Sequence, residues 1–220
     1  MRTSVGVVAA VVLVGAAVAA YCFEGKATTM ATAPAKLMTR ASAAATDEVV
    51  IEVDVGVHPK STPLLTEADV TAIAADGSSL LENTEFAGDV ACAVKIVVKK
   101  LNHIRIGDGI VDSPVAFDAL FLDTANLQLA EKTNHWQVRV VKEISWCNTF
   151  VPAGGCADVN GRRIAVARRP SPIEGILWAH EIGHTQGLLH RTDSDVALMR
   201  PSILPQHNLL TQTECDAFRK

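Results

Sequence analysis

Residues 180–190 of the sequence read HEIGHTQGLLH, a stretch that contains three histidines and one glutamate. His180 and His184 are four residues apart, and on an α-helix this spacing places two side chains about 40° apart on one face. Both imidazoles are therefore expected to reach one metal ion. Glu181 is rotated by about 100° from His180, so we expect it beside a water molecule on the metal rather than among the ligands.

The third histidine follows the second after six residues, with a glycine between them. A ligand on the next helical turn would repeat the same face, so the chain must leave the helix and return to the ion. Gly187 permits this turn because glycine adopts a positive φ without strain. His190 then completes a site of three neutral imidazoles and one water, the open coordination that is typical of catalytic zinc.

The chemistry of such a site is that of a zinc hydrolase. Zinc lowers the pKa of its water towards about 7 and polarises a substrate carbonyl. Glu181 would take a proton from the water and pass it to the leaving amine. We therefore expect one catalytic zinc ion, held by His180, His184 and His190, with Glu181 as the general base.

The histidine stretch belongs to a helix with clear boundaries, SPIEGILWAHEIGHTQG at 171–187. Ser171 is a candidate N-cap, Pro172 suits the first helical position, and Glu174 completes a capping box. Gly187 is expected to end the helix in a left-handed conformation.

Strands and shorter helices are expected before this helix. Alternating β-branched residues predict strands at 49–55, 89–101 and 136–146. Helical spacing or a capping residue at the start predicts helices at 63–83, 111–122 and 123–132. Asn160-Gly161 lies between two extended runs within 155–168 and predicts a β-hairpin. Together these elements indicate an α+β domain.

The full pattern HExxHxxGxxH resembles that of the metzincins, whose second mark is a downstream methionine turn. VALMRPSI at 196–203 supplies Met199, and the resemblance is closest to the matrixin branch, where GLxH and ALMxP are usual. It implies a metzincin-like catalytic domain, with a twisted mixed sheet, an active-site helix and a small C-terminal subdomain. It also implies that Met199 forms a hydrophobic floor under the metal. In this family the substrate lies along an edge strand, which here is expected in the 155–168 hairpin.

The chain departs from the matrixin pattern in several places. Signatures of a second zinc, of calcium and of a pro-domain cysteine are not recognisable in the sequence, so one zinc is the expected cofactor. Arg200 and Ile203 stand where matrixins often have tyrosines around the specificity pocket, so substrate preference does not transfer. Tyr21 is the only tyrosine, and the methionine-turn tyrosine ligand of the astacin branch is therefore absent.

The N-terminal residues 1–20 have the layout of a secretory signal peptide, with Arg2 before an apolar run that ends in small residues. Residues 21–46 carry little large apolar surface and are expected to be a flexible linker or short pro-segment. The zinc peptidase domain is then expected at 47–220. Export to the cell envelope or the medium is expected; a membrane anchor over 5–20 and a lipid on Cys22 are the alternatives.

Five cysteines in an exported chain predict disulfide bonds. Cys147 and Cys156 flank a short loop and are expected to pair, which leaves Cys92 and Cys215 for a long-range bond. Free thiols and the other connectivities of these four cysteines are the alternatives. Cys22 is left over.

The net charge of −4 argues against a nucleic-acid binder. RRIAVARR at 162–169 is expected to be a strand with solvated ends, with a polyanion site as the alternative. We expect a monomeric, exported zinc endopeptidase that acts on protein or peptide substrates and has no membrane contact beyond the N-terminus. The alternatives are a zinc amidohydrolase acting on a non-protein substrate and an inert binding module of the same fold.

Overall fold

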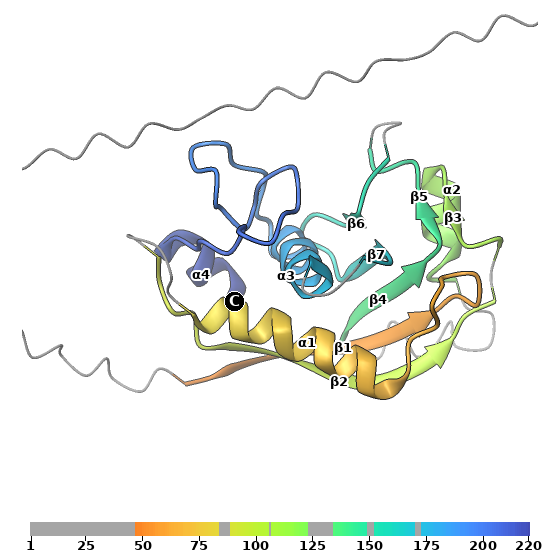
Figure 1. Ribbon diagram of the computed structural model, residues 1–220, viewed down its shortest axis with the longest axis horizontal. Coiled ribbons are helices and arrows are strands. Elements are labelled where there is room, and N and C mark those ends of the chain that lie inside the picture. The colour runs from red at the N-terminus through yellow and green to blue at the C-terminus, as the bar shows by residue number, and fades with distance from the viewer. Residues whose placement is uncertain (1–46, 84–88, 106, 123–133, 149–151, 170–172) are drawn as a thin grey trace, which may run out of the picture. The chain divides into compact units, whose positions relative to one another are not determined.

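The computed structural model describes residues 47–83, 89–105, 107–122, 134–148, 152–169 and 173–220 (Figure 1). These residues belong to one unit of the chain, Ala43–Lys220. Several features predicted from the sequence lie outside the described residues: the signal peptide, the 21–46 segment, Cys22, the helix at 123–132, and the capping residues Ser171 and Pro172.

Five strands form the main sheet, in the order β2-β1-β4-β7-β6. Their bounds are β1 (Val49–Val57), β2 (Val94–His103), β4 (Trp136–Val141), β6 (Gly155–Ala157) and β7 (Arg163–Ala167). The pairs β1–β2, β1–β4 and β4–β7 are parallel, and β6 pairs antiparallel with β7 at one edge. The sheet is therefore mixed and mostly parallel, within an α+β fold.

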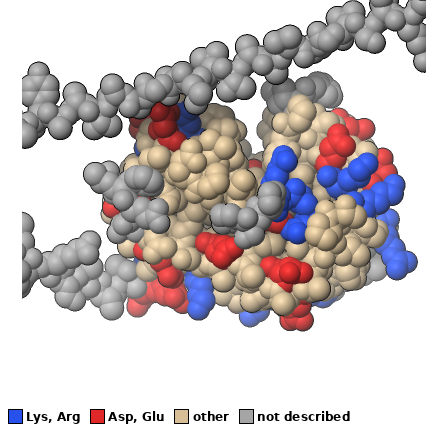
Figure 2. Space-filling model, in the orientation of Figure 1, with Lys and Arg blue, Asp and Glu red and all other residues tan. Residues whose placement is uncertain are grey.

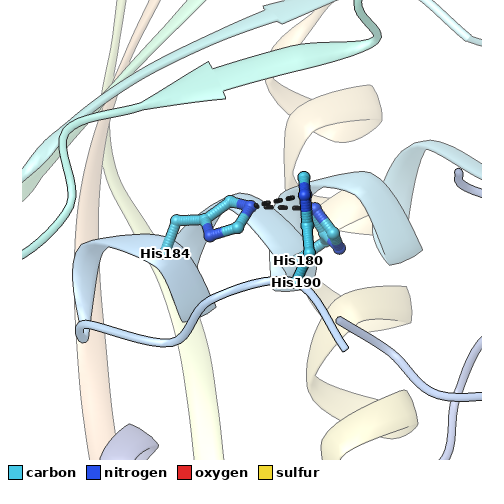
Figure 3. Close-up of side chains that lie close together, drawn as sticks. All are labelled: His180, His184 and His190. Atoms are coloured by element: carbon cyan, nitrogen blue, oxygen red, sulfur yellow. Dashed lines mark hydrogen bonds between the residues drawn. The ribbon is translucent and has the colours of Figure 1, made fainter. Parts of the chain in front are cut away.

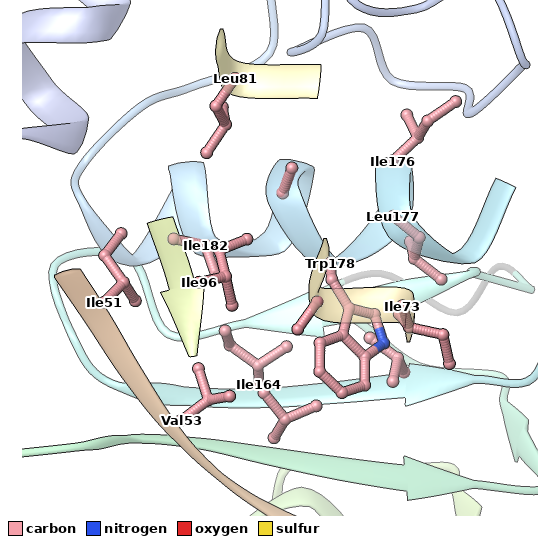
Figure 4. Packing of buried hydrophobic residues seen from close by; sticks show 14 of the residues in the cluster. Ile51, Val53, Ile73, Leu81, Ile96, Ile164, Ile176, Leu177, Trp178 and Ile182 are labelled. Carbon is pink, nitrogen blue, oxygen red and sulfur yellow. The ribbon is translucent and has the colours of Figure 1, made fainter. Parts of the chain in front are cut away.

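Two long helices pack on one face of this sheet (Figure 1). They are α1 (Glu67–Glu82) and α3 (Ile173–Thr185). Figure 4 shows Trp178 and Ile182 of α3 directed towards Val53 of β1 and Ile164 of β7, and all four side chains are buried. This aliphatic core holds α3 firmly against the sheet, which fixes the position of every side chain that α3 carries.

A glycine contact brings α1 and α3 close together. Gly77 lies opposite Gly175, and a Cβ on Gly175 would come within 3.0 Å of the Gly77 nitrogen. A glycine within the helix predicted at 63–83 is unfavourable for helix formation, and the structure gives the physical reason why Gly77 occupies this position. The helices approach closely only because neither residue has a side chain.

The elements differ in length from those predicted. The strand predicted at 136–146 is divided, because β4 ends at Val141 and β5 (Glu143–Ile144) pairs with β3 (Ile110–Val111) in a separate small sheet. The helix predicted at 111–122 is shorter, α2 (Pro114–Ala119), with Ser113 as its N-cap. The strand predicted at 89–101 begins only at Val94.

The hairpin prediction is confirmed by the antiparallel pair β6–β7. The chain reverses between Asp158 and Arg163, and Asn160 has a positive φ of 60° there. Within the described residues, β6 is consequently the free edge of the sheet on the side of α3 (Figure 1).

Both predicted cysteine pairs, Cys92–Cys215 and Cys147–Cys156, are bonded in the structure. The first attaches the C-terminal helix α4 (Gln212–Phe218) to the segment that enters β2. The second joins β6 to the segment after β5. Among the described residues, no helix has both the length and the apolar character needed to span a membrane.

Candidate metal centre

The three histidines of the 180–190 stretch meet at the C-terminal half of α3 (Figure 3). The Nε2 atom of His184 lies 3.1 Å from that of His180 and 3.1 Å from that of His190. In a tetrahedral zinc site with Zn–N bonds of about 2.0–2.1 Å, ligand nitrogens are separated by about 3.3 Å. The three side chains therefore fit one zinc ion.

Backbone carbonyls orient two of these rings. The Nδ1 atom of His180 lies 2.8 Å from the carbonyl oxygen of Leu198, and that of His184 lies 2.7 Å from the carbonyl oxygen of Leu188. When each Nδ1–H donates to its carbonyl, the lone pair of Nε2 is left for a metal. The tautomers that the carbonyls favour are thus the ones that a metal ion needs.

The electrostatics of the cluster keep these imidazoles neutral. Burial, followed by the nearby charge of His184, lowers the pKa of His180 to about 3. Burial is also the main cause that lowers the pKa of His184 and His190. Because a metal binds the deprotonated imidazole, protons compete little for this site at neutral pH.

The side chain of Glu181 lies between α3, the helix that carries it, and the edge strand β6. Its side chain is only 4% exposed, and a Cβ on Gly155 of β6 would come within 2.3 Å of its Oε1 atom. Any side chain on Gly155 would therefore displace the carboxyl group. Burial raises the pKa of Glu181 to about 8, so in the metal-free protein this group holds a proton at neutral pH.

We expect Glu181→Gln to stabilise the metal-free protein at pH 8 but not at pH 4.5. Between the ordinary pKa of 4.5 and the folded value of about 8, the folded state holds a proton that the unfolded state has released. The free energy of unfolding from this group therefore falls as pH rises through that window, and glutamine suffers no such loss. The gain at pH 8 is on the order of 4 kcal/mol.

Denaturant unfolding of both proteins in chelator, at the two pH values, measures this difference. A gain of the same size at both values would show that burial of Glu181 does not raise its pKa.

The turn after α3 is built around Gly187, whose φ of 85° confirms the predicted left-handed conformation. The Gly187 N–H donates to the carbonyl of His184, and the Leu188 N–H donates to the carbonyl of Gly183. This pair of bonds is the Schellman arrangement at a helix C-terminus. Asn160 of the hairpin packs against the turn, with its Oδ1 atom 2.4 Å from the place that a Cβ on Gly187 would occupy.

Gly187→Val is therefore expected to lower zinc affinity because it displaces His190, although it replaces no metal ligand. A β-branched residue is strained at a positive φ, and here its side chain would also collide with Asn160. Gly107→Val is the matched control, because Gly107 has a φ of 72° but no atom within 4 Å of the place that a Cβ would occupy. Zinc titration of the two variants should show weakened binding only for Gly187→Val. Parent-like zinc affinity in that variant would contradict this account of the turn.

Met199 is the residue that the sequence resemblance implies as a hydrophobic floor under the metal. It is fully buried, and a Cβ on Gly183 would come within 2.6 Å of its sulfur. Its neighbour Leu198 accepts the His180 bond, and its own carbonyl accepts from the N–H of Arg191, next to His190. The methionine turn thus contacts the chain on both sides of the histidine cluster.

The sequence did not point to two supports of the site, Gly155 and Arg191. Arg191 donates through Nη1 to Glu214 of α4 at 2.7 Å and through Nε to Asp193 at 2.7 Å. It therefore ties the segment that carries His190 to the C-terminal helix. A basic residue directly after the third histidine was the available signal, but its partner is distant in sequence.

The histidines and Glu181 open into a cleft of about 930 Å³. One wall comes from β6 and the segment before it, and the other from residues 201–203 after the methionine turn. Leu177, one helical turn before Glu181, continues the floor of the cleft along α3. The size and the largely apolar walls are those of a ligand site.

The sequence matches no family model and no curated protein. Solved structures with a similar fold include metalloproteinase-II from Bacteroides fragilis, with a TM-score of 0.53, 16% identity, and coverage of 80% of this chain and 54% of that one. A chain in a chaperone–substrate complex has a TM-score of 0.52 and 14% identity, over 79% of this chain and 34% of that one. The present chain spans about half and about a third of their lengths, and the likeness is one of fold.

Proposed function

We propose that this protein is a zinc-dependent endopeptidase. The observation that carries the proposal is the convergence of three neutral histidine Nε2 atoms beside a buried glutamate, in the lining of a cleft that also contains a strand edge without a partner among the described residues. The likeness in fold to a metalloproteinase is compatible with it. His180, His184 and His190 would hold the zinc ion.

Zinc, when bound, supplies a Lewis acid that activates a water molecule and polarises a carbonyl group. Glu181 accepts the proton of the attacking water and transfers it to the nitrogen of the leaving amine. Its carboxyl group is held for this role by the edge strand at Gly155.

The edge strand β6 provides the place for a peptide substrate. Its outer side has no strand partner among the described residues, and Gly154, Gly155 and Ala157 line the cleft. An extended peptide would add to this edge by main-chain hydrogen bonds, with the scissile carbonyl placed over the histidines. We propose that the substrates are proteins or peptides and that the enzyme is a monomer. We also propose that it is exported, in agreement with its two disulfide bonds.

Digestion of casein by the purified, zinc-loaded protein tests the proposal, with mass spectrometry of the products. New amino termini at internal sites, abolished by chelator and restored by zinc, are the expected result. Intact casein together with zinc-dependent hydrolysis of a non-protein amide in a parallel assay would instead indicate an amidohydrolase. A zinc-loaded protein that binds peptides and cleaves none would indicate an inert binding module.

A further inference from the structure

The arginine-rich stretch 162–169 forms β7 and its flanks, and three of its four arginines have partners. Arg162 lies over the ring of Trp136, with 4.7 Å from its Cζ to the centroid. Arg163 forms ion pairs with Asp118 and Asp158. Arg168 forms an ion pair with the buried Glu174. These three side chains hold the hairpin and the start of α3 in place.

Arg169 is different, because its side chain lines the cleft. A Cβ on Gly154 would lie 3.6 Å from its Nε atom, 3.7 Å from its Nη2 atom and 3.5 Å from Cδ1 of Leu177. The guanidinium group therefore lies over the segment that enters β6, close to Leu177. In the parts of the chain that the structure describes, it forms no ion pair.

Charged side chains are few in the described lining of the cleft. Among the described residues that line it, Glu181 is the only carboxylic acid and Arg169 the only arginine or lysine. Arg169 itself is exposed, and Leu177, Ile173 and Ile203 are apolar residues that line the same cleft. Figure 2 shows the hollow on this face, with basic side chains beside it.

The position of Leu177, the residue of α3 near Arg169, indicates the part of a bound peptide that Arg169 would meet. Leu177 lies one helical turn before Glu181, about 6 Å along the axis and on the same face. His184, by contrast, lies beyond Glu181 towards the C-terminus of the helix. Because Glu181 must reach the leaving amine, the half of the cleft on its Leu177 side receives the residues that follow the scissile bond.

We propose that Arg169 selects substrates with a carboxylate on the C-terminal side of the scissile bond, a proposal that rests on the proposed peptidase function. A guanidinium group binds a carboxylate through two parallel hydrogen bonds. Leu177 beside it would contact the methylene groups of a glutamate side chain. The same chemistry would accept the free C-terminal carboxylate of a short peptide, so the two sources are separated in the test.

The test uses four matched peptides built around a cleavage site located by mass spectrometry. They carry Glu or Gln directly after the scissile bond, each with a free or an amidated C-terminus. We expect kcat/KM to be at least about tenfold higher for peptides that carry the carboxylate bound by Arg169 than for the matched peptides that lack it. A Glu-over-Gln preference that persists in the amidated pair assigns a side chain. A free-over-amidated preference assigns the C-terminus.

In Arg169→Gln, the ratio of kcat/KM between peptides with and without the accepted carboxylate is expected to fall to about one. Arg169→Glu is expected to favour a peptide with lysine at this position over the glutamate peptide. Arg105→Gln is the matched control, because Arg105 is exposed and lies outside the cleft, and it should keep the parental ratio. The zinc-loaded Glu181→Gln protein can be titrated with the same peptides, which it should not cleave. Their affinities should follow the order of the kcat/KM values measured with the parent.

The outcomes separate the two proposals. If the parent cleaves all four peptides at equal rates, or if Arg169→Gln keeps the parental ratio, the role of Arg169 is wrong while the peptidase function stands. If the zinc-loaded parent cleaves no peptide, the peptidase function itself is wrong. In that case, equal affinity of the Glu and Gln peptides would overturn the role of Arg169 as well.

Discussion

Replacing Glu181 by glutamine is expected to leave zinc bound and to lower kcat for a peptide at least about 100-fold. Glutamine has nearly the same shape and cannot accept the proton of the attacking water. The space beside Gly155 accommodates it, because that space is filled by a carboxyl group of equal size. Since Glu181 is outside the histidine cluster, the metal ligands are unchanged.

Metal analysis and a peptide assay on one preparation measure both halves of this prediction. Glu67→Gln is the control, because Glu67 is exposed at the start of α1 and far from the cleft in the fold. Its activity should match that of the parent. Full activity of zinc-loaded Glu181→Gln would mean that another group is the base.

His190→Ala is expected to lose zinc, with an affinity lower by more than about 100-fold. Removal of hydrogen-bond partners of metal ligands already costs about 10–100-fold, and His190 is itself a proposed ligand. It is also the member of the cluster that α3 does not carry. The two remaining imidazoles, both on one helix face, would leave two positions of the metal open to water.

Zinc affinity is measured by competition with a chelator of known affinity. His103→Ala is the control, because His103 is exposed at the end of β2 and outside the cluster. It should bind zinc as tightly as the parent. Parental affinity in His190→Ala would remove His190 from the ligand set and with it the proposed three-histidine site.

The parts of the site that the sequence predicted are those governed by local geometry. His180 and His184 face one way because of the helical repeat, and Gly187 turns the chain because of its backbone freedom. The Asn160-Gly161 hairpin follows from equally local turn preferences. In each of these cases the residues that decide the structure are neighbours in the sequence.

The features that sequence reasoning missed depend on contacts between distant segments. Nothing near Gly155 indicates that Glu181 will lie against it, and nothing near Arg191 indicates Glu214 as a partner. The early end of β4 at Val141 depends on β5 pairing with β3, a separate part of the fold. Arg169 was expected at the solvated end of a strand, with a polyanion site as the alternative, and its place in the cleft depends on how β6 and α3 pack.

The order of the sheet also lies beyond the sequence pattern. Alternation identifies strands but not neighbours, so the central position of β1 between β2 and β4 is visible only in the structure. This order leaves β6 as the free edge beside α3. The proposed substrate strand therefore depends on tertiary pairing, although the metal ligands do not.

The most direct measurement is a zinc titration of the metal-free protein, with hydrolysis of an internal peptide bond followed at each step. The account predicts no hydrolysis without metal, a rise in proportion to added zinc, and a plateau at one ion per chain. Full activity in excess chelator would contradict it. So would a protein that binds one zinc ion through His180, His184 and His190 and hydrolyses no peptide bond.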